Sequence, residues 1–592
     1  MKIYRVKSFL LAMFLFCFSL AIPLIAVSQT SGMELATEAR SLYNNREYQG
    51  AIDLWQKAAN TFEKQQAPLN QAMALSNLSI TYQQLGEWQL GKESIESSLA
   101  ILDRQVETPE LLTVLASTLE IQGKLLLTVG EAASALDSWQ EATEIYTKIE
   151  NQDSITRSQI NQAQVMQNLG LYPKACKTIT KALALNVRDC EITEAALQEL
   201  TASENLSLQI KGLVSLGNIL RVMGENERSR NVLLTAEKLG NSQNLNLASV
   251  YLALGNTSVA LAQENTYFAR GTNIGSTASK NYEAAVANYL KDAENYYSQT
   301  IALATNPITI IQGKANLLNL FIQNKRGNPK GLISEIDTQL ANLPTTPEKI
   351  LTQINFARSL LKLKQEGLAT PNIAEITKNA ISQADSLGSA RIQAFALATL
   401  GQYYELEKQW KLAENTTKQA LNYTLGYNDR DIASEVFWQL GRIEQAQNKR
   451  QAAIDAYTRA YELLQSLRND LIATSPDTQF SFRDRLEPVY RQLVELLLSP
   501  EIEPTQAELA QARQVIESLQ LAELDNFFNE ACIRANPVQI DKIAPNTAVI
   551  YSIILKDRLE VIISLPNGKL LHKSTTTGDR IEQVIAELMD TI

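Results

Sequence analysis

The run Ala51-Ile52-Asp53-Leu54-Trp55-Gln56-Lys57-Ala58 decides the fold, because its spacing recurs along most of the chain. A small residue is followed after four positions by a large apolar residue, and after three more by a second small residue. Two close copies and four looser copies of this spacing follow: Ala135-Trp139-Ala142, Ala453-Tyr457-Ala460, Gly91-Ile95-Ser98, Ala175-Ile179-Ala182, Ser229-Leu233-Ala236 and Ala413-Thr417-Ala420. In a helix, these three positions lie along one face.

A further small residue precedes each run by twelve positions. These residues are Ala39, Ser79, Gly123, Ala163, Gly217, Gly401 and Gly441. A small residue in a first helix lets a second helix approach closely, and the large residue then packs into the gap. The pattern therefore predicts helix pairs that bury Trp55, Trp139, Phe437 and Tyr457 in the core, where they serve packing and bind no ligand.

This pattern resembles the tetratricopeptide repeat over most of residues 33–465. The distance from Ala51 to Gly91 is 40 positions, as is the distance from Ala413 to Ala453, against about 34 in the usual repeat. The longer period suits helices that are longer by most of a turn each. The resemblance implies a mainly α fold, a right-handed α-solenoid of eight to ten tetratricopeptide-like helix pairs.

The patterns divide the chain into six parts. These are a signal peptide (1–28), tetratricopeptide-like repeats (33–304) with an exposed polar loop near 265–279, degenerate helical repeats (305–390), further tetratricopeptide-like repeats (391–465), long helices (466–532) and a C-terminal α/β segment (533–592). The long helices are expected over 460–498 and 506–531, with a break at the two prolines of 499–504.

The N-terminal segment has the features of an export signal. Lys2, Arg5 and Lys7 precede an apolar run over 9–27, and Ala26-Val27-Ser28 offers a small-x-small cleavage site. We therefore expect a periplasmic or extracellular protein. The alternative is a membrane anchor at residues 9–27, because the run is close to the length that spans a bilayer.

Composition excludes several kinds of site. A net charge of -10, with no cluster of Lys and Arg beyond the N-terminus, argues against nucleic-acid binding. His572 is the single histidine, and no zinc-ligand spacing or phosphate-binding glycine loop occurs, so we predict no metal, cofactor or catalytic residue. Cys176 and Cys190 are 14 positions apart, about 21 Å along a continuous helix, and a disulfide between them is not expected.

Residues 547–592 lack the repeat pattern. The run 547–555 is apolar on both alternate faces, which predicts a strand buried on both sides. A second strand follows with Leu559, Val561 and Ile563 on one face, then a turn at 566–568 and a third strand over 569–573. A helix is predicted from Asp579. Three strands and one helix cannot cover a doubly buried strand, so the α/β segment is expected to be incomplete and to expose an edge and a face.

Two stretches carry a second resemblance. Residues 517–532 (Glu-Ser-Leu-Gln-Leu-Ala-Glu-Leu-Asp-Asn-Phe-Phe-Asn-Glu-Ala-Cys) and 548–565 resemble the lead-in helix and first strands of the CHAT family, caspase-like domains found after tetratricopeptide arrays. The resemblance implies a caspase-like fold and a cysteine peptidase that uses a His–Cys dyad. In the family this dyad lies well downstream of these strands, and no position before Ile592 matches it.

Two functions are weighed. The first is an exported scaffold that binds a protein or peptide in the concave groove of the repeats, with a partial CHAT domain and no peptidase activity in this chain. The alternative is a truncated portion of a CHAT-family cysteine peptidase whose His and Cys lie beyond residue 592. Cys532 and His572 match no family position, so we interpret them as a packing cysteine and a surface histidine. Asn218 and Arg221 could hold a carboxylate, but adjacent repeats show no matching pair, and no site is assigned to them.

Overall fold

A computed structural model shows a mainly α protein. It describes residues 31–169, 171–188, 190–200, 205–270, 275–324, 329–368, 370–424, 430–472, 479–528, 547–555, 558–566 and 568–576. The predicted signal peptide and Cys532 lie outside these residues. The described chain forms two compact units, which we call unit 1 (31–84 and 89–106) and unit 2 (85–88 and 107 onward).

Unit 1 consists of two helix pairs. Its helices are α2 (Gly32–Asn44), α3 (Tyr48–Lys64), α4 (Pro68–Leu85) and α5 (Trp88–Leu102). Trp55 of α3 is 1% exposed, and Ala39 of α2 is fully buried in the same cluster. Between α4 and α5, the hydroxyl of Ser98 donates to the carbonyl oxygen of Ala72 at 2.8 Å and lies 2.9 Å from the hydroxyl of Ser76. Small residues thus bring the helices of unit 1 into close contact.

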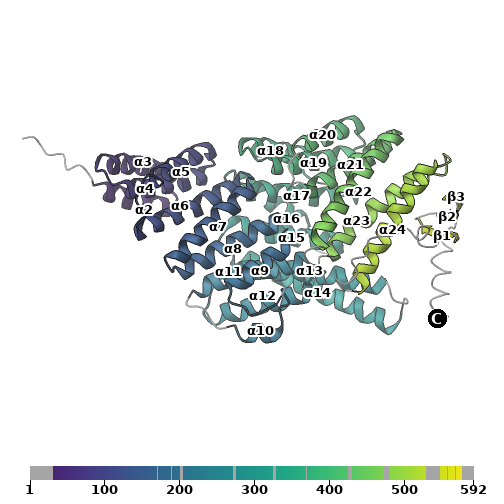
Figure 1. Ribbon diagram of the computed structural model, residues 1–592, viewed down its shortest axis with the longest axis horizontal. Helices are drawn as coiled ribbons and strands as arrows, with labels where there is room; N and C mark the ends of the chain where they lie inside the picture. Colours follow the sequence, from purple (N-terminus) through teal and green to yellow (C-terminus); the bar gives the residue numbers. More distant parts are fainter. Residues whose placement is uncertain are drawn as a thin grey trace, which may run out of the picture. The chain divides into compact units, whose positions relative to one another are not determined.

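Unit 2 begins with further pairs of the same kind (Figure 1). Its first helices are α6 (Pro109–Thr128), α7 (Ala132–Lys148), α8 (Gln152–Asn168), α9 (Tyr172–Ala182), the short α10 (Glu194–Gln198), α11 (Leu206–Val222), α12 (Asn226–Asn241), α13 (Ala248–Arg270) and α14 (Thr277–Leu303). The next are α15 (Pro307–Asn324), α16 (Pro329–Ala341), α17 (Pro347–Gln365), α18 (Ile373–Ser386), α19 (Ala390–Leu406), α20 (Trp410–Asn422), α21 (Arg430–Ala446) and α22 (Arg450–Ile472).

The predicted repeat architecture is confirmed. With α10 set aside, α2 to α22 form ten successive pairs within the described residues, at the upper end of the expected eight to ten. The motif residues lie where the helices of a pair meet: Trp139 is 3% exposed and Tyr457 is 1% exposed. Phe437 is partly buried and packs against the cluster that contains Tyr457. The sequence pattern therefore identifies the contact between the two helices of each pair.

The two helices of a pair approach each other so closely that the first needs glycine at the pattern position. A Cβ atom added at Gly123 would lie 2.8 Å from the ring of Trp139, and one added at Gly441 would lie 2.8 Å from the ring of Tyr457. Real Cβ atoms do not approach carbon atoms this closely, so each helix would have to move outward from its partner.

Gly123→Ala should therefore lower the free energy of unfolding by about 1–3 kcal/mol, because the added methyl group overpacks the contact with Trp139. Gly91 in α5 is the matched control, since a Cβ atom there meets its nearest neighbour at an ordinary 3.5 Å. Gly91→Ala should instead stabilise its helix by about 0.5–1 kcal/mol. Urea unfolding followed by circular dichroism measures both changes, and equal signs for the two variants would contradict the packing described here.

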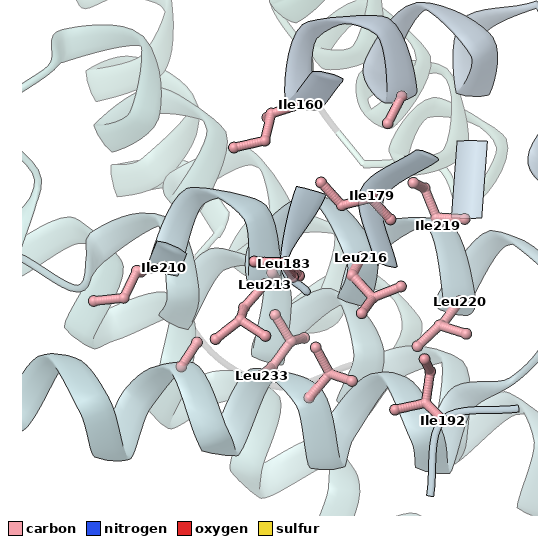
Figure 2. Close-up of a cluster of buried hydrophobic side chains, with 14 of the residues drawn as sticks. Ile160, Ile179, Leu183, Ile192, Ile210, Leu213, Leu216, Ile219, Leu220 and Leu233 are labelled. Atoms are coloured by element: carbon pink, nitrogen blue, oxygen red, sulfur yellow. The ribbon is translucent and has the colours of Figure 1, made fainter. Parts of the chain in front are cut away.

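A large apolar cluster joins α8, α9, α11, α12 and α13 (Figure 2). Ile160 of α8, Ile179 of α9, Leu213 of α11 and Leu233 of α12 all belong to this cluster and are labelled in Figure 2. Each is 4% exposed or less. Burying side chains of this size favours folding by about 1.5–3 kcal/mol each.

A disulfide joins Cys176 and Cys190 at the side of this cluster, and the prediction that they do not pair was wrong. That prediction assumed one continuous helix. In the structure, α9 ends at Ala182, and Ala184 takes a positive φ of 53° that turns the chain back. The Cα atoms of the two cysteines are consequently 6.1 Å apart, within the range that a disulfide spans.

Two predicted boundaries differ from those of the structure. The polar loop predicted near 265–279 is bounded by α13, which extends to Arg270, and by α14, which begins at Thr277 with Ser276 as its N-cap, while residues 271–274 lie outside the described residues. The single helix predicted over 460–498 is divided, with α22 ending at Ile472 and α23 spanning Gln479–Leu497, while α24 (Gln506–Phe528) follows the expected break.

The C-terminal strands form an antiparallel sheet in the order β1 (Val549–Ile554), β2 (Arg558–Ser564), β3 (Leu570–Thr576). The side-chain amide of Gln506 in α24 bonds to the backbone of Leu570 in β3. It donates to the carbonyl oxygen of Leu570 at 2.9 Å and accepts from the backbone N–H of Leu570 at 3.0 Å. The hydroxyl of Tyr551 donates to Glu517 of α24 at 2.7 Å. These bonds attach the sheet to α24.

One face of the sheet is open among the described residues. Ile550 is 68% exposed and Ile554 is 44% exposed, so the strand is not buried on both sides here and exposes one face, as expected of an incomplete α/β segment. In β2, the fully buried residues Glu560 and Ile562 alternate with Leu559 and Val561, which are only partly buried. The face predicted from the apolar alternation is thus the less buried one.

Candidate functional site

Six helices of unit 2, each of them the first helix of its pair, form a layer in which each contacts the next. They are α11, α13, α15, α17, α19 and α21. Each carries a buried glycine or alanine. The residue directly after it is polar and half-buried in every case: Asn218, Asn256, Asn316, Arg358, Gln402 and Arg442. We call these six residues the inner row. Since they repeat at one position of each helix, they lie on one side of the layer.

The two arginines of the inner row are satisfied by ion pairs between helices. Arg358 lies 2.8 Å from Glu435 of α21 and stacks on the ring of Phe395, 5.5 Å from its centroid. The guanidinium of Arg442 is bidentate on Glu405 of α19, at 2.8 and 3.0 Å. This end of the row is thus rigid and electrically compensated.

The other end of the row contains amides. The side-chain oxygen of Asn256 accepts hydrogen bonds from the hydroxyl of Tyr297 at 3.0 Å and from the amide of Asn316 at 2.8 Å. Burial raises the pKa of Tyr297, although the nearby charge of Arg221 lowers it in part, so this phenol is neutral and donates. The side chain of Asn218 makes no hydrogen bond to any residue that the structure describes.

The pair considered in the sequence, Asn218 and Arg221, lies one turn apart on the half-buried side of α11. Arg221 adds a cation to the end of the inner row. The sequence did not point to the other members of the row. Asn, Gln and Arg have only their polarity in common, and no single residue type recurs at this position. The signal that identifies them is their constant position, one residue after the packing glycine or alanine.

His572 belongs to a different cluster, in the C-terminal sheet. The sequence suggested a surface histidine, and this prediction was wrong because the side chain is largely buried. Its Nε2 atom is 2.7 Å from Oε2 of Glu560, a carboxylate that is fully buried. The other oxygen of Glu560 lies 2.5 Å from Nε of Arg558 and 3.1 Å from the hydroxyl of Ser574. Sequence analysis missed this cluster because alternating charge in a short strand indicates a solvated face.

No grouping of three or more His, Cys, Asp or Glu residues that could hold a metal ion occurs in the described part of the chain. One described helix, α6, is long and apolar enough to cross a membrane by composition, with a mean hydropathy of 1.3 over its most apolar window. It packs against α7 through Gly123 and Trp139, as a core helix of the array does.

No family model matches the chain, and no curated protein matches it. Among solved structures, a Rap protein complexed with Competence and Sporulation Factor is similar at 11% identity and a TM-score of 0.40, over 68% of this chain and 99% of that one. The apo form of RapI gives 11% and 0.39, over 71% and 98%. The Cut9 and Hcn1 hetero-tetramer of APC/C gives 12% and 0.24, over 83% and 97%. At such low values, we base no inference about this chain on them.

Proposed function

We propose that this protein is an exported scaffold that binds an extended segment of another protein along the inner row. The observation that carries the proposal is the row itself, six half-buried amide and guanidinium side chains at one position of six adjoining helices. An Asn or Gln side chain both donates and accepts, so it can pair with the amide and carbonyl groups of a peptide backbone.

The spacing of the row suits an extended chain. Packed helices lie about 8–10 Å apart, and an extended strand advances about 3.3 Å per residue. Successive members of the row would therefore meet about every third residue of the bound segment. Backbone pairing of this kind gives affinity, while the side chains between the contacts give specificity.

Export rests on two features. The sequence of residues 1–28 has the order of charge, apolar run and cleavage site that a signal peptide requires. The disulfide between Cys176 and Cys190 adds support, since such bonds persist in oxidising compartments. N-terminal sequencing of the mature protein tests the proposal: a start near Gln29 fits export, and a retained Met1 fits the membrane anchor at residues 9–27.

The relation to CHAT domains is a second, finer proposal. The resemblance of residues 517–532 and 548–565 supports it, and the strands β1 and β2 lie where that resemblance expects strands. It makes this chain the front portion of a caspase-like cysteine peptidase whose dyad lies beyond residue 592. The genomic sequence after the Ile592 codon tests it: an open frame with His and Cys motifs is expected, and a stop codon followed by unrelated sequence would exclude it.

Binding along the inner row is tested by selecting peptides from a random phage library on the chain without its first 28 residues. We expect selected peptides to lose roughly twofold to tenfold in affinity for Asn218→Ala, because one hydrogen bond contributes about 0.5–1.5 kcal/mol. Asn231→Ala is the matched control, since Asn231 is exposed on α12, which is outside the layer that carries the inner row. Equal affinities for the two variants, or selection of no peptide, would contradict the proposal.

A further inference from the structure

The helices α13 and α14 form a hairpin that is longer than the helices on either side of it. They span 23 and 27 residues, against 16 in α12 and 18 in α15. Tyr251 stacks on Tyr296 near the base of the hairpin, and Phe268 contacts Tyr282 near its closed end. At 1.5 Å per residue, α14 is about 40 Å long and α15 about 27 Å. Part of the hairpin therefore extends past the neighbouring helix.

The outer half of the hairpin contributes no apolar residue to the core. Among the described side chains of 263–292, only Ser279 is buried, and it is polar. The amide of Asn226 in α12 donates to Glu264 of α13 at 2.9 Å, and every buried residue of α13 that the structure describes precedes this bond. The hairpin beyond Glu264 thus serves no packing role in the array.

The closed end of the hairpin carries aromatic rings and positive charge. Tyr267 is 36% exposed and Phe268 is 39% exposed, and their ring centroids are 5.9 Å apart. In α14, Lys280 is exposed and Tyr282 is half-buried. We call Tyr267, Phe268, Lys280 and Tyr282 the tip. Over 265–282 the sequence contains two basic residues and no acidic one, in a chain whose net charge is -10.

We propose that the tip docks onto the surface of a membrane that contains anionic lipids. Aromatic side chains, tyrosine above all, are enriched where a bilayer meets water, because the ring is apolar and the hydroxyl stays hydrated. Basic residues close to such a surface are attracted to its negative headgroups. The same surface repels the rest of this acidic chain, so the contact is confined to the tip.

The small area of the tip favours a membrane over a protein as its partner. A stable protein interface buries about 800 Å² on each partner. The exposed parts of Tyr267 and Phe268 offer under about 100 Å² each. An interfacial anchor needs to enter the boundary between headgroups and acyl chains by only about 5–10 Å. The hairpin has this reach, since α14 exceeds α15 by about 13 Å.

Flotation of vesicles in a sucrose gradient tests the docking. The chain starts at Gln29, because the apolar run 9–27 would bind lipid by itself. The vesicles contain either an equal mixture of phosphatidylglycerol and phosphatidylcholine or phosphatidylcholine alone. We expect the chain to float with the mixed vesicles only, and added salt should release it, because salt screens the attraction between the basic residues and the headgroups.

Variants of the tip give the expected magnitudes. Lys280→Ser should weaken binding about fivefold, as expected for one basic residue near an anionic surface. The double substitution Tyr267→Ser and Phe268→Ser should weaken it at least tenfold. Leu303→Ser is the matched control and should leave binding unchanged, because Leu303 is 45% exposed at the opposite end of α14. Equal flotation of the tip and control variants, or equal flotation with phosphatidylcholine alone, would overturn the inference.

Fluorescence separates insertion into the membrane from other contacts of the tip. Brominated phosphatidylcholine in the mixed vesicles should quench the added emission of a Phe268→Trp chain and leave that of a Leu303→Trp chain unchanged. Sedimentation of the chain without vesicles provides the opposing outcome. If the double substitution lowers the sedimentation coefficient there, the tip joins two copies of the chain, and the membrane inference is wrong.

Discussion

Trp139→Ala should lower the free energy of opening of helices α6 to α8 by about 3–5 kcal/mol, the largest effect expected in the repeats. Trp139 is 3% exposed and fills the space between Gly123 of α6 and the packed face of α7. Its side chain also packs in one apolar cluster with Val165 of α8. Removing the indole leaves a cavity at the meeting point of three helices.

Amide hydrogen exchange, read by mass spectrometry for each helix, measures this change. Leu412→Ala in α20 is the control, because Leu412 is 49% exposed and its truncation should change the free energy of opening by less than about 0.5 kcal/mol. Similar protection of α6 to α8 in both variants would show that the recurring aromatic position is dispensable for packing.

Glu560→Ala should detach the C-terminal sheet, at a cost of about 3–5 kcal/mol, because it leaves the buried guanidinium of Arg558 without its closest counterion. Glu560 is fully buried and joins Arg558, His572 and Ser574 across strands β2 and β3. Arg558 in turn donates to the carbonyl oxygen of Glu495 in α23 at 3.1 Å. The loss therefore reaches both the sheet and its attachment to the helices.

Limited proteolysis measures the detachment as faster cleavage within residues 547–576, while the repeats stay protected. Lys573→Ala, an exposed change on β3, is the control and should leave the cleavage rate unchanged. The double substitution Arg558→Met and Glu560→Leu should restore protection, because apolar residues of similar volume replace a buried ion pair at little cost. Equal cleavage of the Glu560→Ala and Lys573→Ala chains would contradict a role for the cluster.

The sequence alone predicted the repeats because their signal is local. Gly123, Trp139 and Ala142 lie within one helix pair, so their spacing determines which surfaces meet. The disulfide was missed because it depends on where α9 ends, and the chain reversal at Ala184 has no glycine to mark it.

The candidate sites depended more on tertiary structure. Asn218 and Arg221 were noticed by position, but the row that contains Asn218 became visible only when the neighbouring helices were known. Glu560 and His572 are polar residues, which sequence patterns predict to be exposed. Their burial follows from docking of the sheet against α24. A strand has two faces, and the apolar alternation in β2 predicted burial of the face that is the less buried one in the structure.

The ion pair between Arg358 and Glu435 bridges α17 and α21 and passes over α19, which lies between them in the layer. A repeat array usually transmits stability only between nearest neighbours, so that segments melt independently. A link to the second neighbour adds a direct coupling between α17 and α21 to the contacts of the array. Opening of α17 and of α21 should consequently be more strongly correlated than opening of helices that are joined only through nearest neighbours.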